Sequence, residues 1–196
     1  AATQSLYFVD IFGKAIHKYV PAEKKHTKAI IGTNHVSLIL PIESSADKFL
    51  ISIGRELAVV TWDGKSEKVS NIEKIAEVDN VPGKLDNRFN DGKCDSSGRL
   101  WAGTMGGEPV NGQVKPNQGS FFSLEGKKVR QHLTNLGVSN GLAWNDELKK
   151  FYFIDSFKYS IEQYEFDISS GTIKNPETIF TLNKHDIPGV PDGMCI

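Results

Sequence analysis

We expect an all-β fold from the sequence, and within that class a β-propeller. No window of 12 or more residues keeps apolar positions at i, i+3, i+4 and i+7 without an interrupting Gly or Pro, so helices are not indicated. Apolar runs of strand length recur at a nearly constant interval instead, and a second strand-like segment follows each run. A sheet of three or four antiparallel strands about every 50 residues is typical of propeller blades.

The interval is set by four apolar runs, each reached through a polar turn. They begin at residues 6, 49, 100 and 151, so successive starts lie 43, 51 and 51 residues apart. A β-sandwich also has many short strands, but it gives no reason for such a repeat. We interpret these runs as the inner strands of four blades, which are Leu6–Asp10, Phe49–Ile53, Leu100–Thr104 and Phe151–Asp155.

The second segment of each repeat completes a predicted hairpin. Turns such as Trp62-Asp63-Gly64 and Ser169-Ser170-Gly171 then close onto further short strands. The Trp62-Asp63 pair does not recur in the other repeats, so the WD-repeat family is not indicated. The four second segments are Ala15–Val20, Glu56–Thr61, Gly119–Leu124 and Ser160–Phe166.

Composition and hydropathy argue against nucleic acid and a membrane as partners. The 23 Lys and Arg nearly balance the 24 Asp and Glu without a basic run, which argues against nucleic acid. The longest apolar stretch, Val36 to Ile42, is far too short to span a membrane. Two cysteines, Cys94 and Cys195, favour a reducing cytoplasm, with one disulfide in a secreted protein as the alternative. The chain begins with Ala1 and has no signal-peptide pattern, so we expect a fragment.

Polar clusters occur at similar phases of successive repeats. Asn87–Lys93 precedes the third apolar run, Ser139–Trp144 precedes the fourth, and Pro191–Ile196 ends the chain. Each cluster alone also suits a turn: a connector rich in Asn and Asp, a hairpin turn at Asn140-Gly141, and a solvent turn at Asp192.

The three polar clusters occupy similar positions within successive repeats, which argues for one shared functional site. Asn90, Asn140 and Asp192 lie 50 and 52 residues apart, and equivalent positions of successive blades surround one channel axis. Amide and carboxylate oxygens converging there favour Ca²⁺ or another hard cation. The five histidines form no i, i+4 pair, which argues against zinc.

Other catalytic motifs are missing. The sequence contains no G-x-S-x-G elbow, no P-loop and no G-x-G-x-x-G fingerprint, so acyl-serine, nucleotide and dinucleotide chemistry have no support. Gly103, Gly106 and Gly107 would let a ligand approach the backbone closely. Glu108 follows them, and taken alone it suits an exposed loop carboxylate.

The sequence contains five motifs that, in their order along the chain, resemble the regucalcin (senescence marker protein)/gluconolactonase family. The segments Ala15–Pro21 and Thr61–Gly64 are most similar to insect members, among them luciferin-regenerating enzymes and regucalcin-like proteins. The resemblance runs along essentially the whole chain. Its motifs are Asn87–Lys93, Trp101–Met105, Ser139–Trp144, Phe151–Ser156 and Pro191–Met194.

The resemblance implies a six-bladed propeller, with about four blades in residues 1–196, that opens a sugar-acid lactone with metal-activated water. By position, Asn140 and Asp192 match metal ligands of the family, and Asp192 also matches its proposed general base. Arg88, Asn90 and Glu108 match residues that contact the substrate. The resemblance implies one divalent ion, Ca²⁺ with Zn²⁺, Mn²⁺ or Mg²⁺ as alternatives. We expect a cytoplasmic protein that is monomeric at full length.

The chain departs from the family at both ends. Members carry an earlier Glu-Gly-Pro-x-Trp motif whose Glu is a metal ligand, and they continue for about two more blades after the Pro-Asp-Gly-Met motif. At about 49 residues a blade, about 98 residues would be missing. We therefore expect one partial propeller domain, exposed blade faces and weak metal binding when the 196 residues are expressed alone.

Three other functions stay open at this point. The same oxygen ligands would serve a calcium-binding regulatory protein without relevant catalysis. A member that recycles an oxidised luciferin would use the same metal with a more apolar pocket. A protein-binding scaffold would need apolar residues at the channel mouth, which the Asn, Arg and Asp found there argue against.

Overall fold

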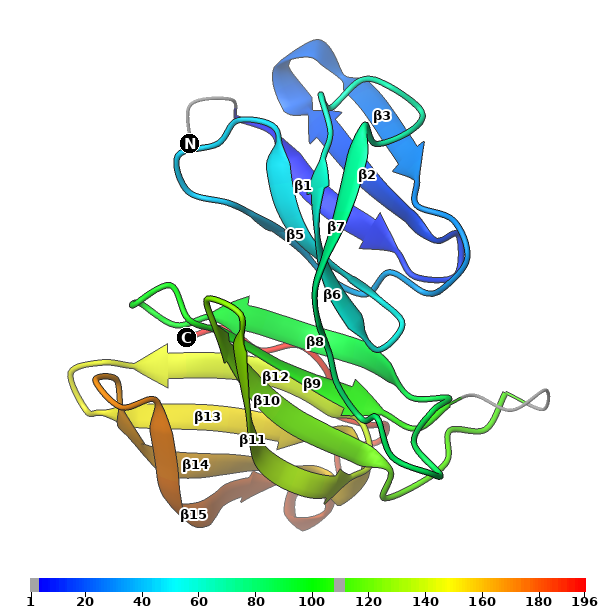
Figure 1. The fold of residues 1–196 in the computed structure, drawn as a ribbon. Helices are drawn as coiled ribbons and strands as arrows, with labels where there is room; N and C mark the ends of the chain where they lie inside the picture. Colours follow the sequence, from blue (N-terminus) through cyan, green and yellow to red (C-terminus); the bar gives the residue numbers. More distant parts are fainter. Residues whose placement is uncertain (1–3, 108–111) are drawn as a thin grey trace. The chain divides into compact units, whose positions relative to one another are not determined.

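The computed structural model describes residues 4–107 and 112–196, and within them it is almost entirely β-structure (Figure 1). The chain divides into two compact units, residues 1–78 (unit 1) and residues 79–196 (unit 2), and each contains two antiparallel sheets. The only helical elements among the described residues are three short 3₁₀ turns, η1 (Pro21–Glu23), η2 (Ser156–Lys158) and η3 (Asn183–His185). The all-β prediction is confirmed.

Unit 1 has a three-stranded and a four-stranded sheet, each with its strands in sequence order. The first pairs β1 (Leu6–Asp10), β2 (Ala15–Val20) and β3 (Lys25–Ile30). The second consists of β4 (Ile39–Pro41), β5 (Lys48–Ile53), β6 (Glu56–Thr61) and β7 (Asn71–Glu77). Largely β-branched and aliphatic residues of both sheets form the core of the unit: Ile16, Ala29, Val36, Phe49, Ile51, Val60 and Trp62.

Unit 2 has two four-stranded sheets of the same meandering order. One consists of β8 (Arg88–Cys94), β9 (Leu100–Met105), β10 (Gly119–Glu125) and β11 (Lys128–Leu136). The other consists of β12 (Ser139–Asn145), β13 (Lys150–Asp155), β14 (Ser160–Asp167) and β15 (Thr172–Thr181). The core between them is mostly aromatic, and it comprises Trp101, Phe121, Leu136, Leu142, Phe151, Phe153, Tyr164 and Phe166.

The eight predicted strands and their hairpins are confirmed, but the place of these strands in the three four-stranded sheets was predicted wrongly. In the four-stranded sheets, the apolar runs expected to be inner strands are the second strands β5, β9 and β13. The first strands of the unit 2 sheets are β8 and β12, which contact each other. They contain most of the Asn87–Lys93 cluster and all of the Ser139–Trp144 cluster, for which no strand was predicted. Asn, Asp and Gly are turn residues by propensity, and here the strand pairing overrides that preference.

Both polar strands contain a β-bulge at the candidate residues. The β8–β9 register shifts between Phe89 and Gly92, so Asn90 and Asp91 lie in the irregular stretch. The β12–β13 register shifts between Asn140 and Leu142, which makes Gly141 the extra residue. Because a bulge re-aims side chains and weakens the local ladder, these shifts position the amides differently from a regular strand.

Candidate metal and lactone site

Every described candidate residue lies in unit 2, on β8, on β12 or in the segment after η3 (Figure 1). Arg88 and Asn90 belong to β8, Asn140 belongs to β12, and Asp192 belongs to the chain that follows η3. Glu108, predicted to contact the substrate, lies outside the described residues.

Asn90 connects the two polar strands. Its Nδ2 donates to the carbonyl oxygen of Ser139 at 3.0 Å and to Oδ1 of Asn140 at 3.2 Å. Its Oδ1 accepts a hydrogen bond from a guanidinium nitrogen of Arg88 at 3.0 Å, and the same nitrogen donates to the carbonyl of Phe89 at 3.2 Å. Arg88 is only 7% exposed, so these bonds fix a buried cation next to the amides.

Asn140 is buried as well and continues the network away from β8. It is 7% exposed, and its Nδ2 donates to Oγ of Ser156 at 2.8 Å. The Ser156 hydroxyl donates in turn to the carbonyl of Pro191 at 2.7 Å. One chain of hydrogen bonds therefore runs from Arg88 to the residue before Asp192.

The segment that carries Asp192 packs directly on β12. The backbone N–H of Gly141 donates to the carbonyl of Asp192 at 3.2 Å. A Cβ at position 141 would lie 2.7 Å from that carbonyl oxygen and 2.8 Å from Cβ of Met194, so the close approach needs glycine. Asp192 itself is exposed, and its side chain is accessible to a ligand.

The charge of Asp192 also reaches Asp91 on β8. Burial is the main cause that raises the pKa of the Asp91 carboxyl, and the charge of Asp192 raises it further. The hydrogen bond from the N–H of Gly92 acts in the opposite direction. Two carboxylates and two amide groups are thus contributed by β8, β12 and the last segment.

This donor set fits a hard divalent cation. Asn90, Asn140, Asp91 and Asp192 offer oxygen donors, and the repulsion that Asp91 feels from Asp192 is what a cation beside both would relieve. Among the residues that the structure describes, no three His, Cys, Asp or Glu side chains form a metal-binding group. A cation here would therefore use amide oxygens as well as carboxylates, as the sequence predicts for Asn140.

The Asn87–Lys93 cluster divides into an anchoring part and a site part. Asn87 donates to Oδ2 of Asp79 at 2.7 Å and to the carbonyl of Gln118 at 2.8 Å. Thr104 and Ser120 also donate to Asp79, at 2.7 and 3.0 Å. Asn87 thus holds the loop before β8 against its own sheet, and the part of the cluster that reaches β12 begins at Arg88.

Three further residues support the site. Asp91 was expected only as the carboxylate of the Asn87–Lys93 cluster, and Asp155 and Ser156 lie in a motif named above without a predicted role. Asp155 is 3% exposed and accepts hydrogen bonds from the N–H groups of Gly137, Val138 and Phe157. It therefore fixes the start of β12 against η2. The bond to Phe157 is the N-cap of η2, a local pattern typical of Asp. The bonds to Gly137 and Val138 span 18 and 17 residues, and no local sequence signal indicates them.

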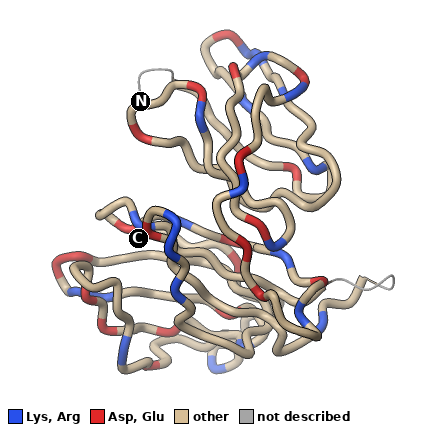
Figure 2. The backbone as a smooth tube through the Cα atoms, viewed as in Figure 1, with Lys and Arg blue, Asp and Glu red and all other residues tan. Residues whose placement is uncertain are grey.

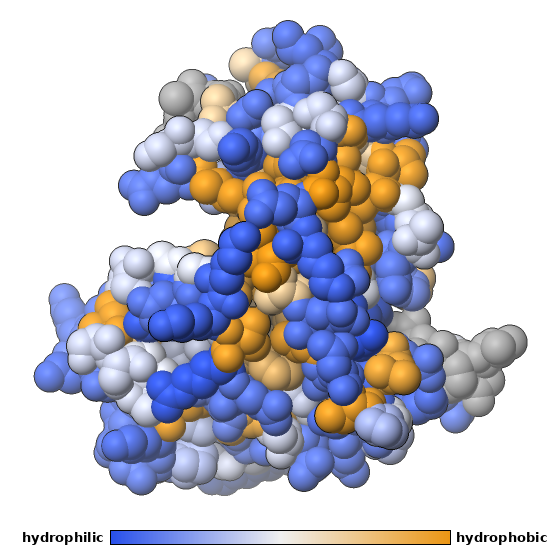
Figure 3. Space-filling model, in the orientation of Figure 1, coloured by the Kyte–Doolittle hydropathy of each residue, from blue (hydrophilic) through white to orange (hydrophobic). Residues whose placement is uncertain are grey.

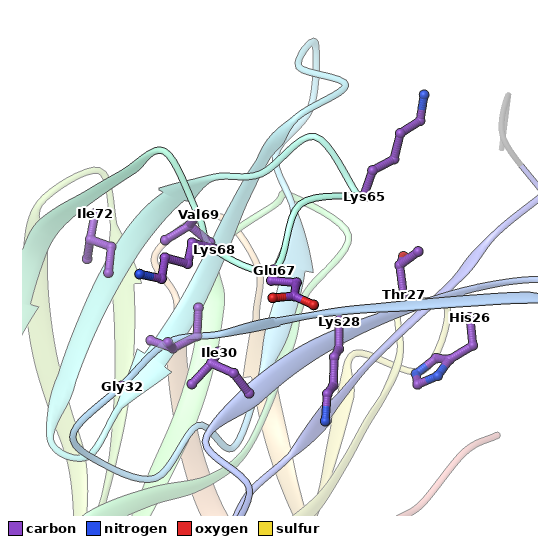
Figure 4. Close-up of a pocket in the computed structure, with 11 residues that line it drawn as sticks. His26, Thr27, Lys28, Ile30, Gly32, Lys65, Glu67, Lys68, Val69 and Ile72 are labelled. Atoms are coloured by element: carbon purple, nitrogen blue, oxygen red, sulfur yellow. The ribbon is translucent and has the colours of Figure 1, made fainter.

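Unit 1 contains a separate groove of about 990 Å³, and none of the candidate residues lines it (Figure 4). Ile30, Val69 and Ile72 line it together with three lysines, Lys28, Lys65 and Lys68. Hydrophobic atoms are visible on the face of unit 1 shown in Figure 3. Acidic and basic residues are both found along the backbone of each unit (Figure 2).

A membrane-spanning helix is not found: within residues 4–107 and 112–196 no helix is long and apolar enough to cross a bilayer.

Comparison with known proteins identifies relatives along the whole chain. Regucalcin of Macaca fascicularis is 34% identical over 200 residues, which cover all of this chain and 62% of the relative. Regucalcin of Gallus gallus is 35% identical over 193 residues, covering 98% of this chain and 60% of the relative. The chain therefore spans about three fifths of the length of the curated relatives it matches.

Solved structures agree with this result. A luciferin-regenerating enzyme superposes with a TM-score of 0.90 at 44% identity and covers 98% of this chain and 62% of its own. A gluconolactonase of Xanthomonas campestris gives a TM-score of 0.70 at 18% identity, covering all of this chain and 63% of its own, which shows the fold alone.

A propeller fold follows from these superpositions and from the repeated sheets. The structure of the Dos1 propeller matches 89% of the chain with a TM-score of 0.59. The four sheets are blades, and the chain is a partial β-propeller. The family model for the SMP-30/gluconolactonase/LRE-like region matches residues 1–196, so the chain belongs to that family.

Proposed function

We propose that the whole protein is a divalent-metal-dependent lactone hydrolase of gluconolactonase type that acts in the cytoplasm on a sugar-acid lactone. The observation that carries the proposal is the hydrogen-bonded chain from Arg88 through Asn90, Asn140 and Ser156 to Pro191. It gathers a guanidinium, two amides and an accessible carboxylate from three separate segments.

Asn140 and Asp192 would hold the cation, with Asn90 and Asp91 close by. A divalent cation bound there supplies Lewis-acid polarisation of the lactone carbonyl. The accessible Asp192 carboxylate would accept a proton from the attacking water as the new carbon–oxygen bond forms. That proton then passes to the ring oxygen as the acyl carbon–oxygen bond breaks, which yields the open hydroxy acid.

Substrate binding would fall to the residues on β8. The buried guanidinium of Arg88 offers fixed donors, and Oδ1 of Asn90, which accepts one hydrogen bond from Arg88, offers a second lone pair to a sugar hydroxyl. Because each group is already held by hydrogen bonds, little ordering is needed on binding. Glu108 remains a predicted further contact.

The test is steady-state hydrolysis of gluconolactone by the whole protein, with Ca²⁺ and after chelation. Asp192→Asn should lower kcat/KM at least about 100-fold, because it removes a charged ligand and the proton acceptor together. The control is Asp186→Asn, because Asp186 is exposed and its φ of 53° suits Asn. Equal activity of the two variants would reject the assignment.

A second candidate function is calcium binding without relevant catalysis. The curated relatives at 34–35% identity are named regucalcin, and the oxygen donor set suits Ca²⁺. Ca²⁺ binding that Asp192→Asn abolishes, in a protein that does not hydrolyse gluconolactone, would favour this function. The luciferin-regenerating relative supports a third test with an oxidised luciferin as substrate.

A further inference from the structure

Ser156 lies between the two segments that carry the predicted metal ligands, Asn140 on β12 and Asp192 after η3. It is the first residue of η2, directly after β13, and it is 2% exposed. Its backbone N–H donates to the carbonyl of Val138 at 3.0 Å, which ties it to the start of β12. Asp155, the residue before it, accepts three backbone N–H groups around the same turn. The position of the Ser156 hydroxyl is therefore fixed by the backbone.

That hydroxyl contacts both segments that carry predicted metal ligands. It accepts from Nδ2 of Asn140 at 2.8 Å and donates to the carbonyl of Pro191 at 2.7 Å. An amide can present either its nitrogen or its oxygen to a given neighbour. By accepting from Nδ2, Ser156 selects the orientation in which Oδ1 of Asn140 points away from η2, toward Asn90 on β8.

We propose that Ser156 is a positioning residue for the metal site, where its hydroxyl sets the amide orientation of Asn140 and holds the Asp192 segment against β12. The inference rests on the proposed function. Gly141 supplies the complementary contact, since its N–H donates to the Asp192 carbonyl and it leaves room for the segment. Asp192 is exposed, and the hydrogen bonds to the carbonyls of Pro191 and Asp192 hold its segment near Asn140.

The test measures Ca²⁺ affinity of the whole protein by calorimetry for wild type, Ser156→Ala and a control, Ser160→Ala. Ser160 is a buried serine of the same sheet, 5% exposed on β14. Loss of groups that orient metal ligands typically costs 10–100-fold in affinity. We expect Ser156→Ala to weaken Ca²⁺ binding by about that factor, and Ser160→Ala to bind Ca²⁺ like wild type.

A second readout separates positioning from a general loss of structure. With gluconolactone as substrate, Ser156→Ala should need about 10–100-fold more Ca²⁺ for half-maximal rate, yet approach the wild-type kcat when Ca²⁺ saturates. Amide hydrogen exchange of Gly141 and of residues 192–194 should be faster in this variant. A purely structural defect would lower kcat at every Ca²⁺ concentration, and that result would overturn the proposal.

Ser156→Cys covers the case in which the alanine variant does not fold. The thiol fills similar space but is a weak donor and acceptor, so we expect a smaller loss of Ca²⁺ affinity in the same direction. Wild-type affinity in a folded Ser156 variant would refute the inference while leaving the proposed function intact. Absence of Ca²⁺ binding by wild type would instead refute the proposed function.

Discussion

The first strands of the sheets differ between the two units, and the difference separates fold from chemistry. In unit 1, β4 is the three-residue strand Ile39–Pro41, and it pairs with β5 without a register shift. In unit 2, β8 and β12 have seven residues each, carry the candidate amides and are bulged where those amides occur. All three strands begin the same kind of meandering sheet. The hairpin pattern thus forms the blade, and the bulged first strand forms the candidate site.

The hydrophobic cores of the two units also differ. Unit 1 packs mainly aliphatic side chains with one Phe and one Trp, whereas unit 2 packs six aromatic residues between its sheets. Phe121 illustrates the density, because its ring lies 4.7 Å from Phe153, 5.6 Å from Phe151 and 5.7 Å from Trp101. Unit 2, which contains the buried polar strands, also has the larger aromatic core. Burial of these rings is expected to offset the free-energy cost of burying polar groups.

The largest predicted effect probes that core. Phe121→Ala removes a fully buried ring and should lower the free energy of unfolding by about 3–5 kcal/mol, measured by chemical denaturation of the whole protein. Phe12→Ala in unit 1 is the control, because Phe12 is 65% exposed and should cost less than about 0.5 kcal/mol. Similar losses for both variants would contradict the packing described.

The next effect probes how closely the two sheets of unit 2 approach at the site. A Cβ at Gly103 would collide with Cβ and Oγ of Ser139, so Gly103→Ala should cost about 2–3 kcal/mol of unfolding free energy. Gly193→Ala is the matched control, since nothing lies within 4 Å of its Cβ position. Adding Ser139→Gly to Gly103→Ala should recover part of the loss in a double-mutant cycle. A strictly additive cycle would show that the two residues do not touch.

A third prediction concerns pH and His132 of unit 2. Burial, followed by the charges of Arg130 and Arg99, lowers the pKa of His132 to about 4 from an ordinary value near 6.5. Between these values the unfolded chain binds a proton that the folded chain does not, so this contribution to stability is present above pH 6.5 and lost toward pH 4. For this half-buried ring we expect a loss on the order of 2 kcal/mol.

The pH prediction is tested by unfolding wild type and His132→Gln at pH 7 and pH 4.5. His132→Gln should show the smaller decrease, and His185→Gln, at an exposed position of η3, should keep the wild-type decrease. Identical pH dependence of wild type and His132→Gln would show that His132 does not titrate in this way.

The smallest effect returns to unit 1. Lys74 pairs with Glu56 at 2.7 Å and with Glu77 at 2.5 Å, but the lysine side chain is 48% exposed. Solvent screening limits such pairs, so Lys74→Met should change the free energy of unfolding only slightly, and less in 0.5 M salt. The buried pair of Arg99 and Asp95 in unit 2 should cost several-fold more when Arg99→Met breaks it. Equal costs would remove this contrast between the units.

Local patterning was enough to predict the repeat, because apolar runs and turns recur every 50 residues. The second strand of each hairpin, such as β6 and β14, falls within about a residue of its predicted range. β8 and β12 were not predicted as strands, because a bulged strand rich in Asn, Asp and Gly has the composition of a turn. The phase of Asn90 and Asn140 predicted their proximity, which their hydrogen bond confirms, whereas their roles stay predictions.

Contacts at long sequence separation could not be predicted from patterning. Asp79 accepts from Ser120, which lies 41 residues away, and Ser156 reaches the Pro191 carbonyl over 35 residues. Nothing in the local composition at Ser156 separates it from an ordinary helix-start serine. The role of such residues can be recognised only in the folded structure, where the topology brings the blade edge and the last segment together.

Anomalous diffraction from crystals of the whole protein grown with Mn²⁺ or Ca²⁺ would locate the cation. We expect one strong peak within about 2.6 Å of both Asn140 Oδ1 and the Asp192 carboxylate. A peak elsewhere in the protein, with these two side chains unchanged and empty between them, would contradict this expectation.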